Sequence, residues 1–303
     1  MNVLVTGGTG FVGREIVRQL RFSGHRVHLL ARDPESPAAQ QVAIQYSAKV
    51  RQGNVIVGSS LRGVCDGMDA VIHLVGIISE YDDQTFDHVH GRGTQNMIFA
   101  AQDGKVQRFI HMSALGSGPN ARSRYHESKW IGEDRVRRSG LAWTVFRPSI
   151  IYGPGDSFVN MLAKAMRLSP IIPVFGNGQT KLQPVAVKCV ATAFVKSLSE
   201  SRAIGESYDL CSPESITFND LLNQVAVALG KKRVKVHVPV ELARLPVGML
   251  EAFYPRVFHR APPVNRDQLT MLQQDNVGDS RPADELFGLK HTSFSEGISK
   301  YVR

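Results

Sequence analysis

Tyr125 and Lys129 are the two residues whose types and spacing most directly suggest catalysis. They stand four positions apart in the segment YHESK (125–129), and residues with this spacing lie on the same face of a helix. An ammonium group beside a phenol favours the phenolate, so Lys129 is expected to lower the pKa of Tyr125 from about 10 toward neutrality. Tyr125 would then protonate or deprotonate a substrate oxygen. Because tyrosine and lysine also occur four residues apart by chance, the catalytic interpretation of this pair depends on the strands and helices around it.

Three glycines near the amino terminus suggest a dinucleotide site. Gly7, Gly10 and Gly13 lie in TGGTGFVG (6–13), directly after an apolar run at 2–5. Gly7 permits a tight turn, Gly10 lets the backbone approach a pyrophosphate, and Gly13 lets the next helix pack closely on the strand. The first N–H groups of that helix would face the phosphates. A purely structural glycine turn is the alternative, but the position between a strand and a helix favours a binding site.

The end of the second predicted strand distinguishes NADP(H) from NAD(H). An acidic residue here binds the adenosine ribose of NAD, whereas this strand ends in LLAR (29–32). The planar guanidinium of Arg32 suits a 2′-phosphate, and Arg14 could assist it. Asp33 supports the competing NAD(H) interpretation, in which Arg32 is an ordinary surface residue. The sequence favours NADP(H), with NAD(H) as the alternative.

These residues need strands and helices that bring them together. The first half of the chain alternates the two, a rhythm typical of the parallel, doubly wound sheet of a Rossmann-type α/β fold. The predicted strands are 2–5, 25–30, 49–52, 69–74, 108–112 and 142–146. The predicted helices are 85–101, 123–138 and one after Gly10 with Phe11, Ile16, Val17 and Leu20 on its apolar face.

After residue 150 the alternation loosens. Proline and glycine cluster at 148–155 and 170–178, and helices such as 218–229 and 240–253 dominate. We therefore expect a dinucleotide-binding Rossmann domain over residues 1–150. A smaller, mostly helical substrate or partner domain is expected over residues 151–303, interleaved with the first in space and packed over the carboxyl ends of the strands.

Composition narrows the class of protein. The chain has 303 residues, 43% of them hydrophobic and 21% charged, as in ordinary globular proteins. Its net charge of +9 is spread evenly, with 18 basic against 13 acidic residues over 1–150 and 18 against 14 over the remainder, so no basic tail suggests nucleic acid as a partner. The three cysteines match no metal-binding pattern. We expect a cytoplasmic protein without a metal, a leader peptide or a membrane-spanning helix.

Six stretches of the first half resemble the extended short-chain dehydrogenase/reductase family. They are TGGTGFVG (6–13), DAVIHLVG (69–76), GTQN (93–96), RFIHMSA (108–114), YHESK (125–129) and RPSIIYGPG (147–155). The resemblance implies that Lys129 holds the nicotinamide ribose. It implies a cofactor site formed by Gly7, Thr9, Gly10, Phe11, Val12, Gly13, Arg32, Asn54, Leu74, Val75, Gly76, Lys129 and Pro148. It implies catalysis by Tyr125, Lys129 and Ser113.

Two positions depart from the family's catalytic set of Asn, Ser, Tyr and Lys. His90 stands in the segment where the family has its Asn. Ser113 lies one place before the expected serine, and only 12 positions before Tyr125. The resemblance therefore implies an intact cofactor site beside a compromised or altered catalytic site. Outside that set, His73 and His111 lie in buried strands and are expected to be hydrogen-bonded core residues.

The carboxyl-terminal stretches PPVNRDQLTMLQQDNV (262–277) and LFGLKHTSFSEGI (286–298) resemble an atypical subgroup of this family. That subgroup contains the accessory dehydrogenase-like subunit of respiratory complex I and relatives linked to quinone metabolism and photosystem assembly. Two hypotheses follow. One is an NADP(H)-dependent oxidoreductase acting on a quinone-like or other apolar carbonyl or alcohol. The other is an accessory or assembly protein that keeps NADP(H) as a structural or sensing ligand in a respiratory or other membrane complex.

The segment LARLPVGMLEAFYPRVFH (242–259) mixes aliphatic, aromatic and basic residues. Glu241, Arg244 and Glu251 exclude a membrane-spanning helix. One interpretation is a lid helix over the substrate cleft. The other is an interfacial surface that docks on a membrane or a membrane complex, which would make the protein peripheral to the inner membrane. The sequence identifies neither the substrate nor the oligomeric state.

Overall fold

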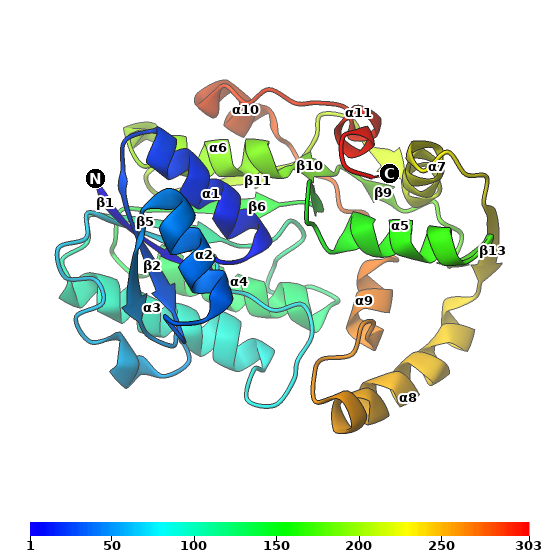
Figure 1. The fold of residues 1–303 in the computed structure, drawn as a ribbon, viewed down its shortest axis with the longest axis horizontal. Coiled ribbons are helices and arrows are strands. Elements are labelled where there is room, and N and C mark those ends of the chain that lie inside the picture. The colour runs from blue at the N-terminus through cyan, green and yellow to red at the C-terminus, as the bar shows by residue number, and fades with distance from the viewer. Residues whose placement is uncertain (303) are drawn as a thin grey trace.

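The computed structural model describes residues 1–302 and is built around a seven-stranded parallel sheet (Figure 1). The strand order is β11-β6-β5-β4-β1-β2-β3, so the chain reverses direction across the sheet between β1 and β4. The strands are β1 (Asn2–Thr6), β2 (Arg26–Ala31), β3 (Lys49–Gln52), β4 (Ala70–His73), β5 (Arg108–Met112), β6 (Trp143–Pro148) and β11 (Glu206–Leu210). This order confirms the predicted Rossmann-type fold, whose ligands bind at such a reversal.

Helices cover both faces of the sheet because their apolar residues pack against the strands (Figure 1). One face carries α1 (Phe11–Phe22), α2 (Pro37–Tyr46), α6 (Val187–Ser197) and α10 (Arg281–Phe287), and the other carries α3 (Gly93–Asp103) and α4 (Arg124–Arg137). In α1 the predicted core residues Ile16, Val17 and Leu20 are fully buried. Phe11 is only partly buried, because it lies at the amino terminus of α1.

A smaller, mostly helical part is built from residues that follow β6. Its helices are α5 (Phe158–Leu168), α7 (Phe218–Ala228), α8 (Val240–Phe258), α9 (Arg266–Met271) and α11 (Phe294–Ser299). Its short strands form the pairs β10 (Val185–Ala186) with β7 (Ile151–Tyr152), β12 (Ile216–Thr217) with β9 (Lys181–Leu182), and β13 (Val234–Val238) with β8 (Ile171–Phe175). Buried residues of α5, α7 and α11 form a separate core. The large sheet nevertheless takes β11 from beyond residue 150.

The helix predicted over 85–101 has a different conformation at its start, close to the candidate site. The helix expected over 85–101 begins as a π-helical turn, Asp87–Arg92, before α3. A Cβ atom at Gly132 would lie 2.6 Å from the His90 carbonyl oxygen, so α4 packs backbone against backbone on this turn. Turns of this kind are common at functional sites. The helix expected over 240–253 extends to Phe258 because the chain continues helically through Pro246 and Pro255.

Three further features concern residues 1–302. No helix in this range is both long enough and apolar enough to cross a membrane. No group of three or more His, Cys, Asp or Glu side chains in this range is arranged to hold a metal ion. The three cysteines, Cys65, Cys189 and Cys211, are buried and form no disulfide.

Candidate active site

The glycine turn joins the end of β1 to the amino terminus of α1. Gly7 has φ of +71°, a left-handed conformation that glycine adopts without strain. The Gly10 amide donates a hydrogen bond to the Gly7 carbonyl oxygen at 3.1 Å, and Gly10 is the N-cap of α1. No side chain caps this helix, and its first turn contains no acidic residue. The N–H groups of Phe11, Val12 and Gly13 therefore remain available to an anion.

Gly10 and Gly13 are needed for different reasons. A Cβ atom at Gly13 would lie 2.2 Å from the Gly7 carbonyl oxygen and 2.6 Å from Gly8 Cα, so α1 can pack this closely on the turn only without a side chain there. A Cβ atom at Gly10 would meet only the Gly7 carbonyl oxygen, at 3.3 Å. Gly10 is also exposed. The space above Gly10 is thus open, as the approach of a pyrophosphate requires.

The carboxyl end of β2 presents a cation without a partner. Arg32 is exposed and forms no hydrogen bond or ion pair within residues 1–302. The carboxylate of Asp33 accepts a hydrogen bond from the Glu35 amide at 2.9 Å, so its own loop holds it. Arg14 donates to a carbonyl oxygen of the glycine turn at 2.9 Å and to Gln41 at 3.3 Å. Arg32 is therefore free to bind an added phosphate.

The end of β4 lies directly beneath the glycine turn. A Cβ atom at Gly7 would lie 3.3 Å from the backbone of both Leu74 and Val75. A Cβ atom at Gly76 would lie 3.6 Å from Nζ of Lys129. These predicted cofactor residues are therefore close neighbours in a row that begins at the glycine turn and ends at the Lys129 ammonium.

Asn54 and Pro148 lie farther out along the same edge of the sheet. Asn54 follows β3, and its side-chain oxygen accepts a hydrogen bond from the Ile56 amide at 3.2 Å. Pro148 ends β6, is buried, and accepts a hydrogen bond from the Leu115 amide at 2.9 Å. The strand order puts Asn54 on the β2 side of β1 and Pro148 on the β5 side. The two residues thus lie on opposite sides of the glycine turn along this edge of the sheet.

Lys129 is buried at the carboxyl ends of β4 and β5. Only 3% of the residue is exposed, and its Nζ donates a hydrogen bond to the Met112 carbonyl oxygen at 2.5 Å. Burial lowers the pKa of this ammonium to about 8, although the charge of Glu133 acts in the opposite direction. The group therefore remains mostly charged at neutral pH, at the place where the resemblance puts a ribose.

The expected lowering of the Tyr125 pKa is wrong for this structure. Burial raises the pKa of the phenol to about 12. The physical reason is that the Lys129 ammonium is hydrogen-bonded to Met112 instead of the phenol, so it does not offset the loss of water. The phenol ring lies among three aromatic rings at centroid distances of 5.3, 5.7 and 6.1 Å, those of His126, His90 and Phe86.

A residue of the smaller part positions the helix that carries Tyr125. Asp267, on α9, accepts hydrogen bonds from the backbone amides of Arg124 and Tyr125 at 2.8 and 3.0 Å. These amides belong to the first turn of α4, where a carboxylate is favourable. No sequence pattern indicates this contact, because the residues that form it are 143 positions apart. The capping box of Asn265 and Gln268 marks the start of α9 in the sequence, but the helix that Asp267 faces depends on the tertiary structure.

His90, which replaces the expected asparagine, connects three segments. Its Nε2 accepts a hydrogen bond from the Ile77 amide at 3.0 Å, so Nδ1 carries the proton. Nδ1 donates to Ser128 Oγ at 2.8 Å, and the Ser128 hydroxyl donates to the Tyr125 carbonyl oxygen. Burial, assisted by the charge of Lys129, lowers the pKa of His90 to about 2. His90 is therefore neutral and holds α4 in place instead of exchanging protons.

Ser113 follows β5 immediately. Its amide donates a hydrogen bond to the Phe146 carbonyl oxygen at 2.7 Å. Its hydroxyl is buried and has no hydrogen-bond partner within residues 1–302. No hydrogen bond in that range links Ser113 to Tyr125. Of the three residues predicted to be catalytic, the structure places Tyr125 and Lys129 on α4 and leaves Ser113 next to Met112, the partner of Lys129.

The two strand histidines differ from each other. His73 is hydrogen-bonded through its two ring nitrogens to Thr6 at 2.7 Å and Thr94 at 3.3 Å, as expected of a core residue. His111 stacks on His73 with a centroid distance of 5.5 Å. Both ring nitrogens of His111 are buried without a hydrogen-bond partner in the described residues, so the expectation of a hydrogen-bonded core residue is wrong for His111. On the adjacent strands it is paired with Val145, which is apolar, and with His73, whose ring nitrogens bind Thr6 and Thr94.

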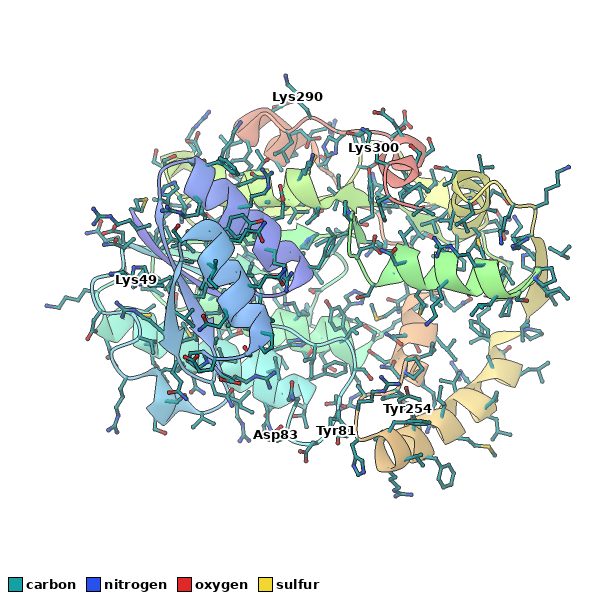
Figure 2. All side chains as sticks on the ribbon, in the orientation of Figure 1. Lys49, Tyr81, Asp83, Tyr254, Lys290 and Lys300 are labelled. Atoms are coloured by element: carbon teal, nitrogen blue, oxygen red, sulfur yellow. The ribbon has the colours of Figure 1, made fainter. Side chains whose placement is uncertain are left out.

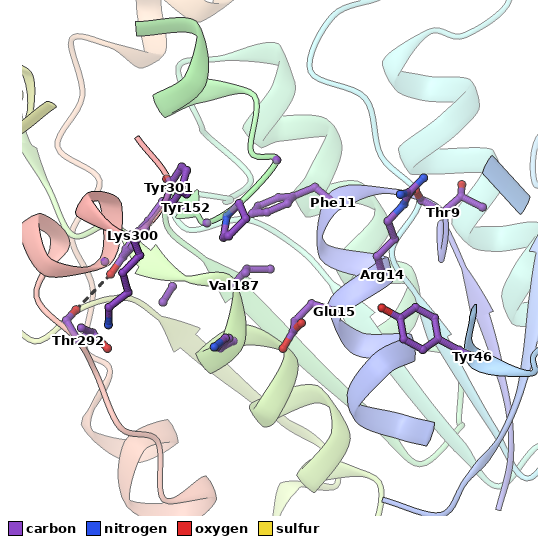
Figure 3. A pocket seen from close by; sticks show the side chains of 16 residues that line it. Thr9, Phe11, Arg14, Glu15, Tyr46, Tyr152, Val187, Thr292, Lys300 and Tyr301 are labelled. Carbon is purple, nitrogen blue, oxygen red and sulfur yellow. Dashed lines mark hydrogen bonds between the residues drawn. The ribbon is translucent and has the colours of Figure 1, made fainter. Parts of the chain in front are cut away.

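A cavity of about 600 Å³ opens beside the glycine turn (Figure 3). One wall comes from the turn, α1 and α2 and includes Thr9, Phe11, Arg14, Glu15 and Tyr46. The opposite wall comes from later segments and includes Tyr152, Val187, Thr292, Lys300 and Tyr301. None of the residues predicted to be catalytic lines it. The cavity therefore adjoins the phosphate end of the predicted cofactor site.

Comparisons with known proteins agree with this arrangement. The model of the NAD dependent epimerase/dehydratase family matches residues 3–211, a range that contains the glycine turn, Tyr125 and Lys129. The chain is 27% identical over 289 residues to NADH dehydrogenase (ubiquinone) 1 alpha subcomplex subunit 9, mitochondrial, of Arabidopsis thaliana, across 90% of this chain and 70% of that protein. It is 29% identical over 242 residues to ceramide reductase of Caulobacter vibrioides, across 78% of this chain and 73% of that protein.

The fold is also similar to solved structures. One is dTDP-glucose 4,6-dehydratase from Streptomyces venezuelae, determined with NAD and TYD bound. The TM-score is 0.78 at 20% sequence identity, and the match covers 100% of this chain and 96% of that one. At this level of identity the likeness concerns the fold alone.

Proposed function

The chain belongs to the NAD dependent epimerase/dehydratase family, and from this premise we propose that it is an NADP(H)-dependent oxidoreductase that reduces an apolar carbonyl substrate. The family consists of NAD(P)-dependent reductases and epimerases of the extended short-chain type. One observation carries the proposal. The Lys129 ammonium is buried at the ends of β4 and β5 on the helix of Tyr125, and residues 74–76 lie between it and the glycine turn.

The residues present fit a nicotinamide dinucleotide. The open space above Gly10 and the unpaired amides of α1 suit a pyrophosphate. The unpartnered guanidinium of Arg32 suits a 2′-phosphate, and Asp33 is held by its own loop. The Lys129 ammonium suits the hydroxyls of a ribose. This set favours NADP(H) over NAD(H).

A bound nicotinamide supplies the hydride acceptor or donor. The chain's own residues would supply orientation and the proton. With a pKa of about 12, the Tyr125 phenol is protonated at neutral pH. This is the form that reduction of a carbonyl requires, although a phenol with a raised pKa is a weaker acid than an ordinary tyrosine. Asp267 binds the first turn of α4, and His90 binds Ser128 on the side of the same helix, so both residues hold α4 in place. A protonated phenol on a helix that is held in place is therefore compatible with reduction.

The apolar character of the substrate is supported by the surroundings of Tyr125. Its ring lies among the rings of Phe86, His90 and His126, and His90 is neutral. These groups offer little to recognise a charged or strongly polar substrate. A relative of this chain is named for the reduction of ceramide, which agrees with an apolar class.

The test is oxidation of NADPH by the purified protein with long-chain ketones and quinones dispersed in detergent micelles. Turnover with at least one substrate, lost in Tyr125→Phe and slower with NADH, is the expected result. If no substrate is turned over while NADPH still stabilises the protein against heat, the oxidoreductase proposal fails.

The second candidate is an accessory protein that keeps NADP(H) as a structural or sensing ligand in a respiratory or other membrane complex. The specific observation in its favour is the catalytic set. The Ser113 hydroxyl is buried without a partner, and a neutral His90 replaces the asparagine. If the protein has this accessory function, Tyr125→Phe should change neither NADPH binding nor co-purification, and Lys129→Met should weaken only the retention of NADPH. Co-purification with a membrane complex, measured for both variants, separates the two candidates.

A further inference from the structure

Helix α8 exposes an apolar stripe that no described residue covers. Its buried residues, Ala243 and Val247, pack against Leu269 of α9. The other side of the helix carries five large apolar residues that are 56–71% exposed: Leu242, Leu245, Met249, Phe253 and Val257. Their spacing of three or four residues places them along one line on a helix. The stripe therefore runs the length of α8 and faces away from the protein.

The position of α8 makes this stripe accessible to a large partner. The helix lies at the lower right edge of the molecule, away from the seven-stranded sheet, and α9 lies on its inner side (Figure 1). Single exposed apolar residues are ordinary, but a continuous exposed set of this size marks an interaction site.

Exposed basic residues lie on α8 and just after it. Arg244 and Arg256 are on the helix and Arg260 follows its end, and Arg260 lies over the Tyr254 ring at 5.6 Å. Of the acidic residues, Glu251 is paired with Arg266 at 2.9 Å and Glu241 lies in the first turn. The exposed Lys231 and Lys232 precede β13, the strand that leads into α8. An apolar stripe with arginines on and just after the same helix complements an anionic lipid surface.

A second copy of the chain fits this face less well. In a symmetric dimer the same patch contacts itself, so the interface would bring together Arg244, Arg256 and Arg260 from each copy. A stable interface also buries about 800 Å² per partner, which is more than one helical stripe of five side chains provides.

The docking helix is linked to the proposed site by α9. Asp267 of α9 binds the amides at the start of α4, and the side chain of Asn265 donates to the Ile78 carbonyl oxygen and to Ser79 Oγ at 3.2 and 3.1 Å. The loop after β4 and the end of α8 therefore flank the same region. Tyr81 and Tyr254, from these two segments, lie along the same lower edge of the molecule (Figure 2).

We propose that α8 docks the protein on a bilayer that contains anionic phospholipids. The apolar stripe enters the boundary between headgroups and acyl chains, and the exposed arginines bind the headgroups. The side of the molecule near Tyr125 then faces the bilayer, from which an apolar carbonyl substrate reaches it. Docking does not depend on the proposed function; only the delivery of a substrate rests on it.

The experiment is co-sedimentation of the full chain with vesicles of phosphatidylcholine and phosphatidylglycerol, without cofactor or substrate. The wild type should bind, and Phe253→Glu should bind at least about tenfold more weakly, because the exposed aromatic ring that would enter the bilayer is replaced by a charge. Phe22→Glu is the matched control. Phe22 is 79% exposed on α1, outside the stripe, and its substitution should leave binding unchanged.

The charge requirement is tested with the same co-sedimentation assay. Binding should weaken in pure phosphatidylcholine, at high salt and in the Arg244→Glu, Arg256→Glu double variant, because each loses attraction between arginines and headgroups. The tryptophan fluorescence of a Phe253→Trp variant should be quenched more strongly than that of the wild type by lipids brominated near the headgroup end of the acyl chain. This difference reports insertion of residue 253 into the bilayer.

Three results would overturn the proposal. They are no vesicle binding by the wild type, binding that Phe253→Glu leaves intact, and a solution dimer that Phe253→Glu dissociates while vesicles have no effect. Turnover of a micelle-dispersed substrate by Phe253→Glu tests the proposed function separately. A variant that retains turnover but not vesicle binding supports docking, whereas a raised KM without any change in vesicle binding identifies α8 as a lid and contradicts docking.

Discussion

Alanine at Gly10 and alanine at Gly13 should damage two different properties of the protein. In Gly13→Ala the new Cβ atom would lie 2.2 Å from the Gly7 carbonyl oxygen, so α1 must move away from the turn. Overpacking of this kind costs about 1–3 kcal/mol. For a chain of this size, each kcal/mol lowers the melting temperature by roughly 2–4 °C. The unliganded variant should therefore melt clearly below the wild type.

Gly10→Ala should leave the unliganded protein nearly intact. Gly10 has φ of −76° and ψ of 174°, a conformation open to alanine. The poorer N-cap and the lower entropy of the unfolded chain offset each other, each at about 1 kcal/mol or less. The added methyl group, however, would occupy the open space where a pyrophosphate approaches. The variant should lose the stabilisation by NADPH, which in the wild type reaches about 2.7 kcal/mol at a hundred times the Kd.

The assay is thermal and urea unfolding of both variants with and without NADPH. Gly118→Ala is the matched control, because a Cβ atom there meets nothing within 4 Å. If Gly10→Ala kept the full NADPH-dependent shift, the glycine turn would not be the pyrophosphate site. If Gly13→Ala melted like the wild type, the close contact between α1 and the turn would not determine stability.

Four other predictions concern single side chains. Arg32→Ala should weaken NADPH binding by roughly 10- to 150-fold, from loss of a charge-assisted contact, and leave NADH binding unchanged; equal wild-type affinities for both in calorimetry would refute it. Tyr125→Phe should lower turnover about 10²–10⁴-fold without changing NADPH affinity, whereas Lys129→Met should lower both; wild-type turnover in Tyr125→Phe would end the acid–base assignment. Because burial lowers the pKa of Lys129 to about 8 while the unfolded value is about 10.4, the unfolded chain binds more protons between these pH values. Stability in urea titrations should then rise over that range by at most roughly 3 kcal/mol, and Lys129→Met should abolish the rise; an equal rise in the variant would contradict the assignment. His111→Leu should stabilise the protein by about 1–3 kcal/mol in urea unfolding, because it removes buried nitrogens without partners; a loss of stability would show that these nitrogens are satisfied.

The fold was predictable because its signals are local. Alternating apolar strands and amphipathic helices require parallel pairing with right-handed crossovers, and few topologies satisfy both. The glycine turn was predictable for the same reason, since backbone conformation and the start of a helix depend on neighbouring residues. The π-helical turn at 87–92 was not predictable, because it depends on close packing of α4 at Gly132.

The site was predictable in its residues but not in its electrostatics. The spacing of Tyr125 and Lys129 places both on α4, yet it does not determine where a flexible lysine side chain points. In the structure the ammonium binds Met112 of β5, and the phenol lies among aromatic rings. The pKa of Tyr125 therefore differs from the simple expectation, because burial and hydrogen bonding come from distant segments.

The sequence by itself determined the parallel sheet, the glycine turn with its open and crowded positions, and the cation at the end of β2. Each depends on residues close together in the chain, whose conformational and burial preferences are local. Only the tertiary structure decided that Asp267 holds the start of the Tyr125 helix, that His90 is neutral, and that Ser113 lacks a partner. The reason is physical: a proton's position and a hydrogen bond's partner depend on which distant groups exclude water from a site.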